Sequence, residues 1–320
     1  MTPPVSGEVP VCGNSHGFDL LVVLGPTASG KTRLGVALCK DLSGEIISAD
    51  SRQVYRGMDI GTGKDLEEYG DIPAHLLDIA EPGEEFNLFA FQRLCLQKID
   101  EIRGRKRLPV IVGGTGLYID AILRRYRLAE VPVNPILRAR LEKLDTESLA
   151  ELLVQSHPAQ HNTTDLCNRE RILRALEIAL GEANAPVLPD FPEMHPLVLG
   201  IRWQRETLRE RIALRLRERL EQGMIEEVAG LAANGVSFTV LERYGLEYRF
   251  VSWFLQGKLS HEEMYQQLLH AICDFSKRQM TWFRRMERLG VTIHWLDGED
   301  DPLAAARHIV ETAQDAPNNS

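Results

Sequence analysis

The feature that most constrains the fold is a glycine-rich segment that follows an apolar run. GPTASGKT, residues 25–32, fits the pattern G-x-x-x-x-G-K-[ST] and separates the run DLLVVLG from a stretch with helical spacing. In such a P-loop the backbone amides and the helix N-terminus hold phosphate groups, the lysine contacts them, and the threonine hydroxyl holds Mg²⁺. We therefore expect a site for a diphosphate or nucleotide, with Thr32 as the magnesium ligand. Its predicted residues are Gly25, Pro26, Thr27, Ala28, Ser29, Gly30, Lys31 and Thr32.

Short apolar runs recur along the chain and predict a parallel sheet. They are DLLVVLG, GEIISAD, RLPVIVGG, HPLVLGI and VTIHWLD, and each is rich in β-branched residues and bounded by turn residues. Helical patterns at 31–41 and 89–104 separate the first three runs, as crossovers between parallel strands require. The predicted fold class is α/β, with a P-loop NTPase-like parallel sheet flanked by helices.

The middle of the chain has a different pattern. Residues 127–180 contain no convincing strand, and apolar residues repeat there at helical spacing, as in NRERILRALEIAL. A Pro-rich segment then leads back to an apolar strand, and further helical patterns run from 204 to about 288. We predict an α/β core made of 18–126 and 190–320, which includes a helical C-terminal region, and a helical insertion at 127–189. Disordered ends are expected at 1–17 and in the final DAPNNS.

Composition excludes several classes of protein. With 320 residues and 44% hydrophobic content, the chain can bury a large core and is no disulfide-stapled miniprotein. Its apolar runs are too short to cross a bilayer, and its N-terminus has no signal-peptide pattern. Five scattered cysteines without a Cys-x-x-Cys pair suggest neither disulfides nor a zinc site. We expect a cytoplasmic monomer with no membrane partner.

Charge alone leaves nucleic-acid binding open. The net charge of −9 counts against it, because phosphate recognition usually requires a basic surface. However, the segments RWQRETLRERIALRLRER and KRQMTWFRRMER concentrate Lys and Arg in the C-terminal half. Glutamates interleave with the arginines of the first segment, so a solvated helix with internal ion pairs explains that segment equally well.

A second predicted strand ends in an acidic residue, Asp50, which follows EIISA. P-loop kinases and NTPases use such a carboxylate to help hold Mg²⁺. The other candidate strand, LPVIVGGTG, ends in Gly113 and Gly114 instead. Asp50 is therefore either the metal-associated carboxylate of an NTPase or a base beside a bound diphosphate.

Several segments together resemble the tRNA dimethylallyltransferase family, also called IPP transferases. GPTASGKT resembles the family's P-loop, and SADSRQVYRGMDIGTGK resembles its next signature. HLLDI, VGGTGLYI and KRQMTWFRR then follow in the family's order. The resemblance spans 20–297 and is much more specific than the P-loop alone. No zinc finger follows KRQ, so the bacterial type of the family is the closer match.

The resemblance implies a prenyl transfer to RNA. A dimethylallyl group would pass from dimethylallyl diphosphate to N6 of adenosine 37 of tRNA, beside the anticodon, giving N6-(dimethylallyl)adenosine and diphosphate. An exocyclic adenine amine is a weak nucleophile, so a base must remove its proton, and Asp50 matches that base. Backbone amides, Lys31 and Mg²⁺ would stabilise the leaving diphosphate. Thr27 and Thr115 match positions beside the base and the leaving group, and they complete the predicted catalytic set.

The resemblance also implies contacts with the anticodon stem-loop. The target base stacks within that loop, so the enzyme must extrude it at a cost of roughly a few kcal/mol. The residues that match RNA-contacting positions are Asp50, Ser51, Arg52, Gln53, Thr115, Arg138, Arg171, Arg174, Lys277, Arg278 and Gln279. We take the arginines of RWQRETLRERIALRLRER as solvated helix residues and leave them out of the site.

The sequence departs from the family pattern at a few positions. Arg52 stands where an apolar residue is frequent, Ala74 replaces a histidine, and Asp65 follows GTGK where Ala and Pro are common. Glu247 stands where the family usually has Gly. These changes fall mostly in segments on the RNA side, so they also fit a divergent paralogue with its own set of tRNAs.

Two other enzymes share parts of this pattern. A free-nucleotide (adenylate) isopentenyltransferase would use the same P-loop and Asp50 but would need neither the helical insertion nor KRQMTWFRR to grip an anticodon stem. A P-loop kinase of small molecules would hydrolyse ATP or transfer its phosphate without tRNA. A non-catalytic RNA-binding protein ranks last, because the P-loop, Asp50 and GGTG are all intact.

Overall fold

The computed structural model describes residues 17–156, 168–181 and 191–315. The predicted disordered ends lie outside these residues, apart from Gly17 and Asp315, and so do Cys12 and Cys167. Among the described residues, Cys39, Cys95 and Cys273 are free thiols. No described helix is long and apolar enough to span a bilayer.

A six-stranded parallel sheet forms the centre of the larger unit. The strands are β1 (Leu20–Leu24), β2 (Gly44–Ala49), β3 (Ala74–His75), β4 (Leu108–Gly113), β5 (Pro196–Arg202) and β6 (His294–Asp297), in the order β3-β2-β4-β1-β5-β6. β1 pairs with β4 and β5 and is buried along its whole length. The structure therefore confirms the predicted α/β class. β3 was not predicted, because a two-residue strand is too short to show a hydrophobic period.

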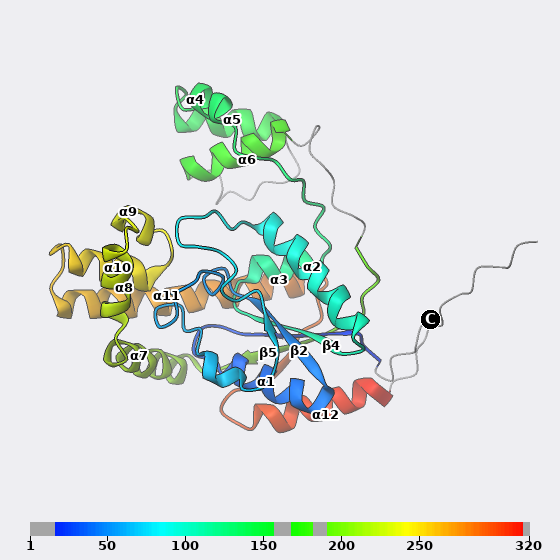
Figure 1. Cartoon of the computed structure of the whole chain (residues 1–320). Helices are drawn as coiled ribbons and strands as arrows, with labels where there is room; N and C mark the ends of the chain where they lie inside the picture. The colour runs from blue at the N-terminus through cyan, green and yellow to red at the C-terminus, as the bar shows by residue number, and fades with distance from the viewer. Residues whose placement is uncertain (1–16, 157–167, 182–190, 316–320) are drawn as a thin grey trace, which may run out of the picture. The chain divides into compact units, whose positions relative to one another are not determined.

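Helices cover both faces of this sheet (Figure 1). α1 (Lys31–Leu42) and α12 (Pro302–Asp315) contact each other below the strands. Alternate strand residues such as Val23, Val110 and Leu199 share a core with them. α2 (Leu88–Gly104) and α3 (Gly116–Leu123) lie above the strands and contact β4. A short 3₁₀ helix, η1 (Leu66–Tyr69), contacts α1.

Five helices extend from the sheet after β5. They are α7 (Arg205–Glu221), α8 (Met224–Ala233), α9 (Phe238–Leu241), α10 (Leu246–Leu255) and α11 (His261–Arg288). α11 starts with a capping box in which Ser260 and Glu263 satisfy each other's backbone N–H groups. Apolar residues of all five helices pack into a second core around the fully buried ring of Tyr248. This core holds α7 and α11 against the P-loop, as described below.

A second compact unit comprises residues 125–191. It contains α4 (Pro135–Leu141), α5 (Thr146–Ser156) and α6 (Arg169–Gly181). α5 and α6 pack through their own small core, which includes Leu149, Leu153, Ile172 and Leu176. No strand is formed by the described residues of this unit, in line with the helical spacing of its sequence.

Candidate active site

The P-loop lies between β1 and α1 and is braced by the C-terminal helices. Gly30, at φ +87°, turns the chain in the left-handed region so that α1 starts at Lys31. Trp203 Nε1 donates to the Ser29 carbonyl at 3.1 Å, and Arg211 Nε donates to the Ala28 carbonyl at 2.9 Å. Both contacts come from residues at or just before α7, so this helix fixes the conformation of the loop.

A cavity of about 710 Å³ opens in front of this loop. It is lined on one side by Gly30, Lys31, Thr32 and Arg33, and on the other by residues of α7. The segment between Asp59 and Glu68 forms the remaining wall. A helix N-terminus and several cations that surround one cavity suit a polyanionic ligand such as a diphosphate.

Three arginines of α7 contribute the positive charge opposite the P-loop, where acidic residues such as Asp65 and Glu68 also line the cavity. Arg211, Arg215 and Arg219 recur every four residues and therefore share one helix face, and all three line the cavity. Arg215 forms an ion pair with Asp65, and Arg211 also stacks over the Trp203 ring at 4.1 Å. Our interpretation of this segment as merely solvated was therefore wrong for these residues. Their spacing of four was the signal that could have identified them.

The cations of this cavity destabilise one another's charge. Burial, together with Arg215 and Arg219, lowers the pKa of Lys31 from 10.5 to about 8, although Asp50 opposes the shift. Burial and Arg215 likewise lower the pKa of Arg219 to about 10. An anion bound between these groups would relieve both effects, so the cavity favours a negatively charged ligand.

Asp50, Ser51 and Thr115 meet at the carboxyl ends of β2 and β4. The Thr115 hydroxyl oxygen accepts a hydrogen bond from the Ser51 backbone N–H at 3.1 Å, and the Thr115 N–H donates to the Ala49 carbonyl. One carboxylate oxygen of Asp50 accepts from the Arg52 N–H at 2.9 Å. In a parallel sheet this edge is where ligands bind. The structure thus brings two of the three predicted catalytic residues together beside the P-loop strand.

Two predicted RNA-contacting glutamines have partners inside the protein. Gln279, on α11, accepts from the Thr27 N–H and donates to the Gly114 carbonyl, both at 2.9 Å. It therefore ties the P-loop to the loop that carries Thr115. Gln53 is buried and links the Ser48 hydroxyl to the Gly63 carbonyl. The described contacts of both side chains thus shape the site from within.

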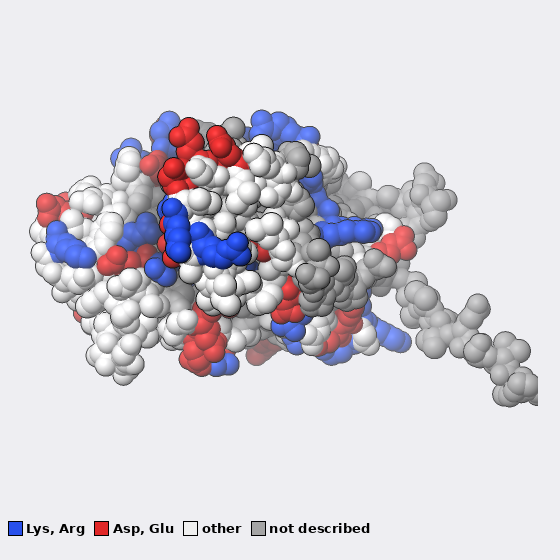
Figure 2. Space-filling view, turned by 90° about the horizontal axis from the view of Figure 1, so that it is seen from above, with Lys and Arg blue, Asp and Glu red and all other residues white. Residues whose placement is uncertain are grey.

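The charged residues predicted to contact RNA lie in both units. On α11, Lys277 pairs with Asp274, and the Arg278 guanidinium lies 5.8 Å from the Phe275 ring centre. In the smaller unit, Arg138 and Arg174 both contact the buried carboxylate of Glu177, and Arg171 lies exposed on α6. Basic and acidic side chains are interspersed over the face seen in Figure 2.

Two departures from the family pattern lie close together in the structure. A Cβ atom built on Gly245 would lie 3.7 Å from both Arg52 Nε and Glu247 Oε2. Burial raises the pKa of the Glu247 carboxyl, and Arg219 and Arg52 oppose that rise. Glu247 lies 3.9 Å from Arg219 Nη1 and therefore adjoins the cationic wall of the cavity.

The residues near the P-loop can accommodate Mg²⁺. The Thr32 side chain lines the cavity beside Lys31 and offers a hydroxyl oxygen, the donor type that Mg²⁺ prefers. No group of three His, Cys, Asp or Glu side chains in the described ranges forms a ready-made metal cluster. Mg²⁺ commonly binds through few protein ligands together with water and substrate phosphates, and Thr32 fits that mode.

Known proteins resemble this chain over most of its length. The family model for IPP transferase matches residues 53–286, and that for isopentenyl transferase matches 18–69. The chain is 61% identical to tRNA dimethylallyltransferase 2 of Syntrophotalea carbinolica over 89% of this chain and 96% of that protein. It is 59% identical to tRNA dimethylallyltransferase 1 of Geotalea uraniireducens over 91% and 97% of the two chains.

A solved structure has the same architecture. The tRNA isopentenylpyrophosphate transferase of Bacillus halodurans matches with a TM-score of 0.68 and 33% identity, over 92% of this chain and 96% of that one. The ranges matched by the two family models include the P-loop, Asp50, Arg215 and Gln279. The chain therefore belongs to the IPP transferase family, the tRNA dimethylallyltransferases.

Proposed function

We propose that this chain transfers a dimethylallyl group from dimethylallyl diphosphate to N6 of adenosine 37 of tRNA. The observation that carries the proposal is the cavity in front of the P-loop, where Lys31 and three α7 arginines surround space for a diphosphate. Asp50 lies at the adjacent sheet edge and acts on Lys31 electrostatically. A base and a diphosphate site side by side are what N-prenylation requires.

The chemistry follows from these positions. The adenine N6 attacks C1 of the donor, the bond between C1 and the diphosphate oxygen breaks, and Asp50 takes the proton that N6 loses. The P-loop amides, Lys31, Arg211 and Arg215 stabilise the charge that develops on the leaving diphosphate. Thr27 and Thr115 complete the catalytic set beside the base and the leaving group. Mg²⁺ held by Thr32 would neutralise part of the diphosphate charge.

The RNA side of the proposal rests on the predicted contact residues. Ser51, Arg52 and Thr115 adjoin Asp50 and would contact the extruded adenosine, while Gln53 and Gln279 hold the surrounding loops. Lys277 and Arg278 would bind the RNA backbone from α11. We assign the same role to Arg138, Arg171 and Arg174, which makes the helical insertion the tRNA-side domain. We further propose that the enzyme acts in the cytoplasm as a monomer.

The free-nucleotide isopentenyltransferase remains the second candidate. It would use the same cavity and Asp50, and one of the two family models, matching 18–69, is that for isopentenyl transferase. Proteins named for tRNA are 61% and 59% identical to this chain over 89% and 91% of its length, which favours tRNA as the acceptor.

The test offers labelled dimethylallyl diphosphate and Mg²⁺ to the protein with unmodified tRNA, AMP or ATP in parallel. We expect label on tRNA alone. Label on AMP or ATP would make the chain a nucleotide prenyltransferase, and ATP hydrolysis without prenyl transfer would support a kinase instead.

A further inference from the structure

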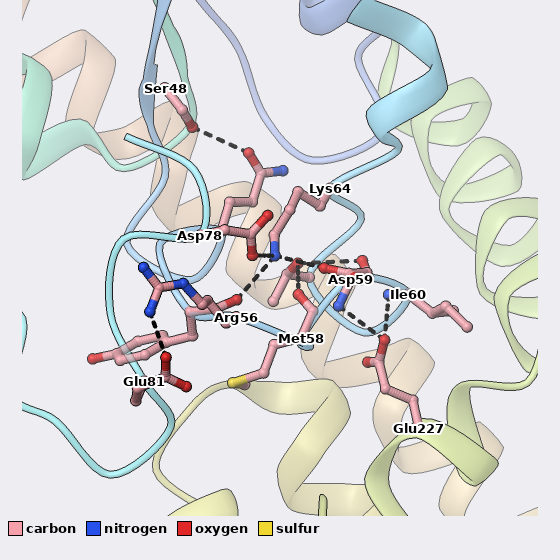
Figure 3. A network of polar contacts seen from close by, with 12 residues as sticks. Ser48, Arg56, Met58, Asp59, Ile60, Lys64, Asp78, Glu81 and Glu227 are labelled. Carbon is pink, nitrogen blue, oxygen red and sulfur yellow. Dashed lines mark hydrogen bonds and ion pairs between the residues drawn. The ribbon is translucent and has the colours of Figure 1, made fainter. Parts of the chain in front are cut away.

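The Glu227 carboxylate on α8 fills a nest of backbone donors in the loop after β2 (Figure 3). Its Oε2 accepts from the N–H groups of Asp59 and Ile60 at 2.8 and 2.7 Å, and its Oε1 accepts from Gly61 N–H at 3.0 Å. The hydroxyl of Tyr248 donates to Oε1 at 2.6 Å. Burial raises the pKa of Tyr248, so the phenol stays a donor. Four donors thus converge on one carboxylate.

The same loop is anchored from its other side by Lys64. Its ammonium group is fully buried and donates to the Tyr55 carbonyl at 2.9 Å and to the Asp59 carboxylate at 2.5 Å. It also pairs with Asp78. Figure 3 shows Lys64, Asp59 and Asp78 converging, with Glu227 on the opposite side of the loop. Glu227 and Lys64 thus fix this loop from two opposite sides.

This loop forms a wall of the diphosphate cavity. Asp59 and Ile60 line it directly. A Cβ atom built on Gly63 would lie 1.5 Å from Arg219 Nη2, so the guanidinium rests against the loop backbone. A Cβ atom on Gly61 would lie 2.7 Å from the Tyr248 ring. Any shift of residues 59–63 therefore moves both the wall and Arg219.

We propose that Glu227 is a positioning residue for the diphosphate of the prenyl donor, acting through the loop 59–63 and Arg219. This inference rests on the proposed function, since it concerns the same cavity. A carboxylate is required because all four partners are donors. The NH₂ group of a glutamine would face two of these four donors. Two buried N–H or O–H groups would then lose their acceptor, and the loop would have to move. A misplacement of about 1 Å at a binding site costs up to roughly 10²-fold in rate.

The test compares Glu227→Gln with Glu226→Gln, the adjacent exposed residue on the same helix. Both changes remove one negative charge from the first turn of α8. Titration calorimetry with inorganic diphosphate and Mg²⁺ gives the binding constant, and steady-state assays with donor and tRNA give the two KM values. We expect Glu227→Gln to weaken diphosphate binding and raise the donor KM by about tenfold, with the tRNA KM unchanged. Glu226→Gln should match the wild type.

A purely structural role predicts a different result. Glu227→Gln would then lower the melting temperature, while the folded protein bound diphosphate as the wild type does, and the proposal would be overturned. Tyr248→Phe provides a milder variant that removes one of the four donors, and we expect a two- to threefold weaker diphosphate affinity from it. Affinity equal to the wild type in both variants would also overturn the proposal. A wild-type protein that binds diphosphate but prenylates no acceptor would refute the proposed function separately.

Discussion

Arginines of α7 and arginines of the helical insertion differ in how their charge is balanced. In the insertion, Arg138 and Arg174 share the fully buried carboxylate of Glu177, and Arg138 binds it in a bidentate manner. On α7, Arg215 has an acidic partner in Asp65, but Arg219 lies 3.9 Å from Glu247 and its Nε has no hydrogen-bond partner. Burial lowers the pKa of Lys31, and Arg215 and Arg219 add to that effect.

This difference separates charge that one buried carboxylate balances from charge that is crowded around a cavity. A guanidinium that is already paired with a buried carboxylate supports local structure, and its removal leaves an uncompensated charge. The cations around the cavity have acidic neighbours such as Asp65, yet burial and mutual repulsion still disfavour their charge, and an anionic ligand would relieve that cost. We therefore expect substitutions on α7 to weaken donor binding. Substitutions around Glu177 should weaken the insertion and, through it, the RNA contacts proposed for Arg138 and Arg174.

The largest decrease in activity is expected from Asp50→Asn, because this substitution removes the proposed base, which lies in the larger unit. Loss of a general base lowers kcat by roughly 10²- to 10⁴-fold. Because tRNA affinity depends on many other contacts, the dissociation constant for tRNA should stay near the wild-type value. Single-turnover transfer at saturating tRNA measures the first quantity and filter binding the second. Normal single-turnover chemistry with lost tRNA binding would contradict this role.

Arg215→Gln tests the group of cations that lines the cavity. Removal of a charged hydrogen bond to the diphosphate costs about 1.5–3 kcal/mol, which corresponds to a donor KM raised by roughly 10- to 100-fold. Arg217→Gln is the matched control, because Arg217 is exposed on the same helix and loses the same charge. Equal donor KM values for the two variants would place the diphosphate away from α7.

The pH dependence tests the lowered pKa of Lys31. The free enzyme loses the Lys31 proton as pH rises through about 8, and the neutral amine holds a diphosphate poorly. We expect kcat/KM for the donor to fall by up to about tenfold per pH unit above 8. Bound diphosphate raises the pKa again, so kcat at saturating donor should fall only at higher pH. A kcat/KM that stays flat to pH 10 would refute the shift.

Glu177→Gln probes the structural group. The two arginines keep partial solvent access, so the loss is limited to about 1–2 kcal/mol of stability in the insertion. Hydrogen exchange of the amides in α6 should accelerate accordingly, while the donor KM stays constant. A raised donor KM without faster exchange would contradict the separation of the Glu177 cluster from the arginines of α7.

The smallest expected effect comes from Arg278→Ala on α11. A single phosphate contact contributes about one unit to the slope of log affinity for tRNA against log salt. Binding measured between low and physiological salt should therefore give a slope shallower by about one. Lys258→Ala, at an exposed lysine outside the proposed RNA contacts, serves as the control. An unchanged slope for Arg278→Ala would remove this arginine from the RNA contacts.

The sequence predicts the sheet and the P-loop well because both leave local signals. The β-branched runs and the glycine-rich pattern are contiguous, and β1, β2, β4, β5 and β6 were all anticipated from them. The helical insertion was visible as a change of hydrophobic period. By contrast, β3 has two residues and depends on pairing with β2, which no local pattern reveals.

The parts of the site that escaped prediction depend on contacts between distant segments. Arg211, Arg215 and Arg219 look like surface residues until α7 packs against the P-loop. Gln279 was predicted as an RNA contact, but the hydrogen bond that it accepts from the Thr27 N–H, 252 residues away, was not. Glu227 accepts hydrogen bonds from a loop that lies more than 160 residues earlier in the chain. Such pairings arise from tertiary packing, so single-sequence patterns do not contain them.

The most direct test of the account maps the transferred group on the RNA. The protein is given labelled dimethylallyl diphosphate with two transcripts of one tRNA that differ only at position 37, one with adenosine and one with guanosine. The account predicts label on the adenosine transcript alone, recovered as N6-(dimethylallyl)adenosine after digestion. Equal labelling of both transcripts, or label elsewhere in the RNA, would contradict it.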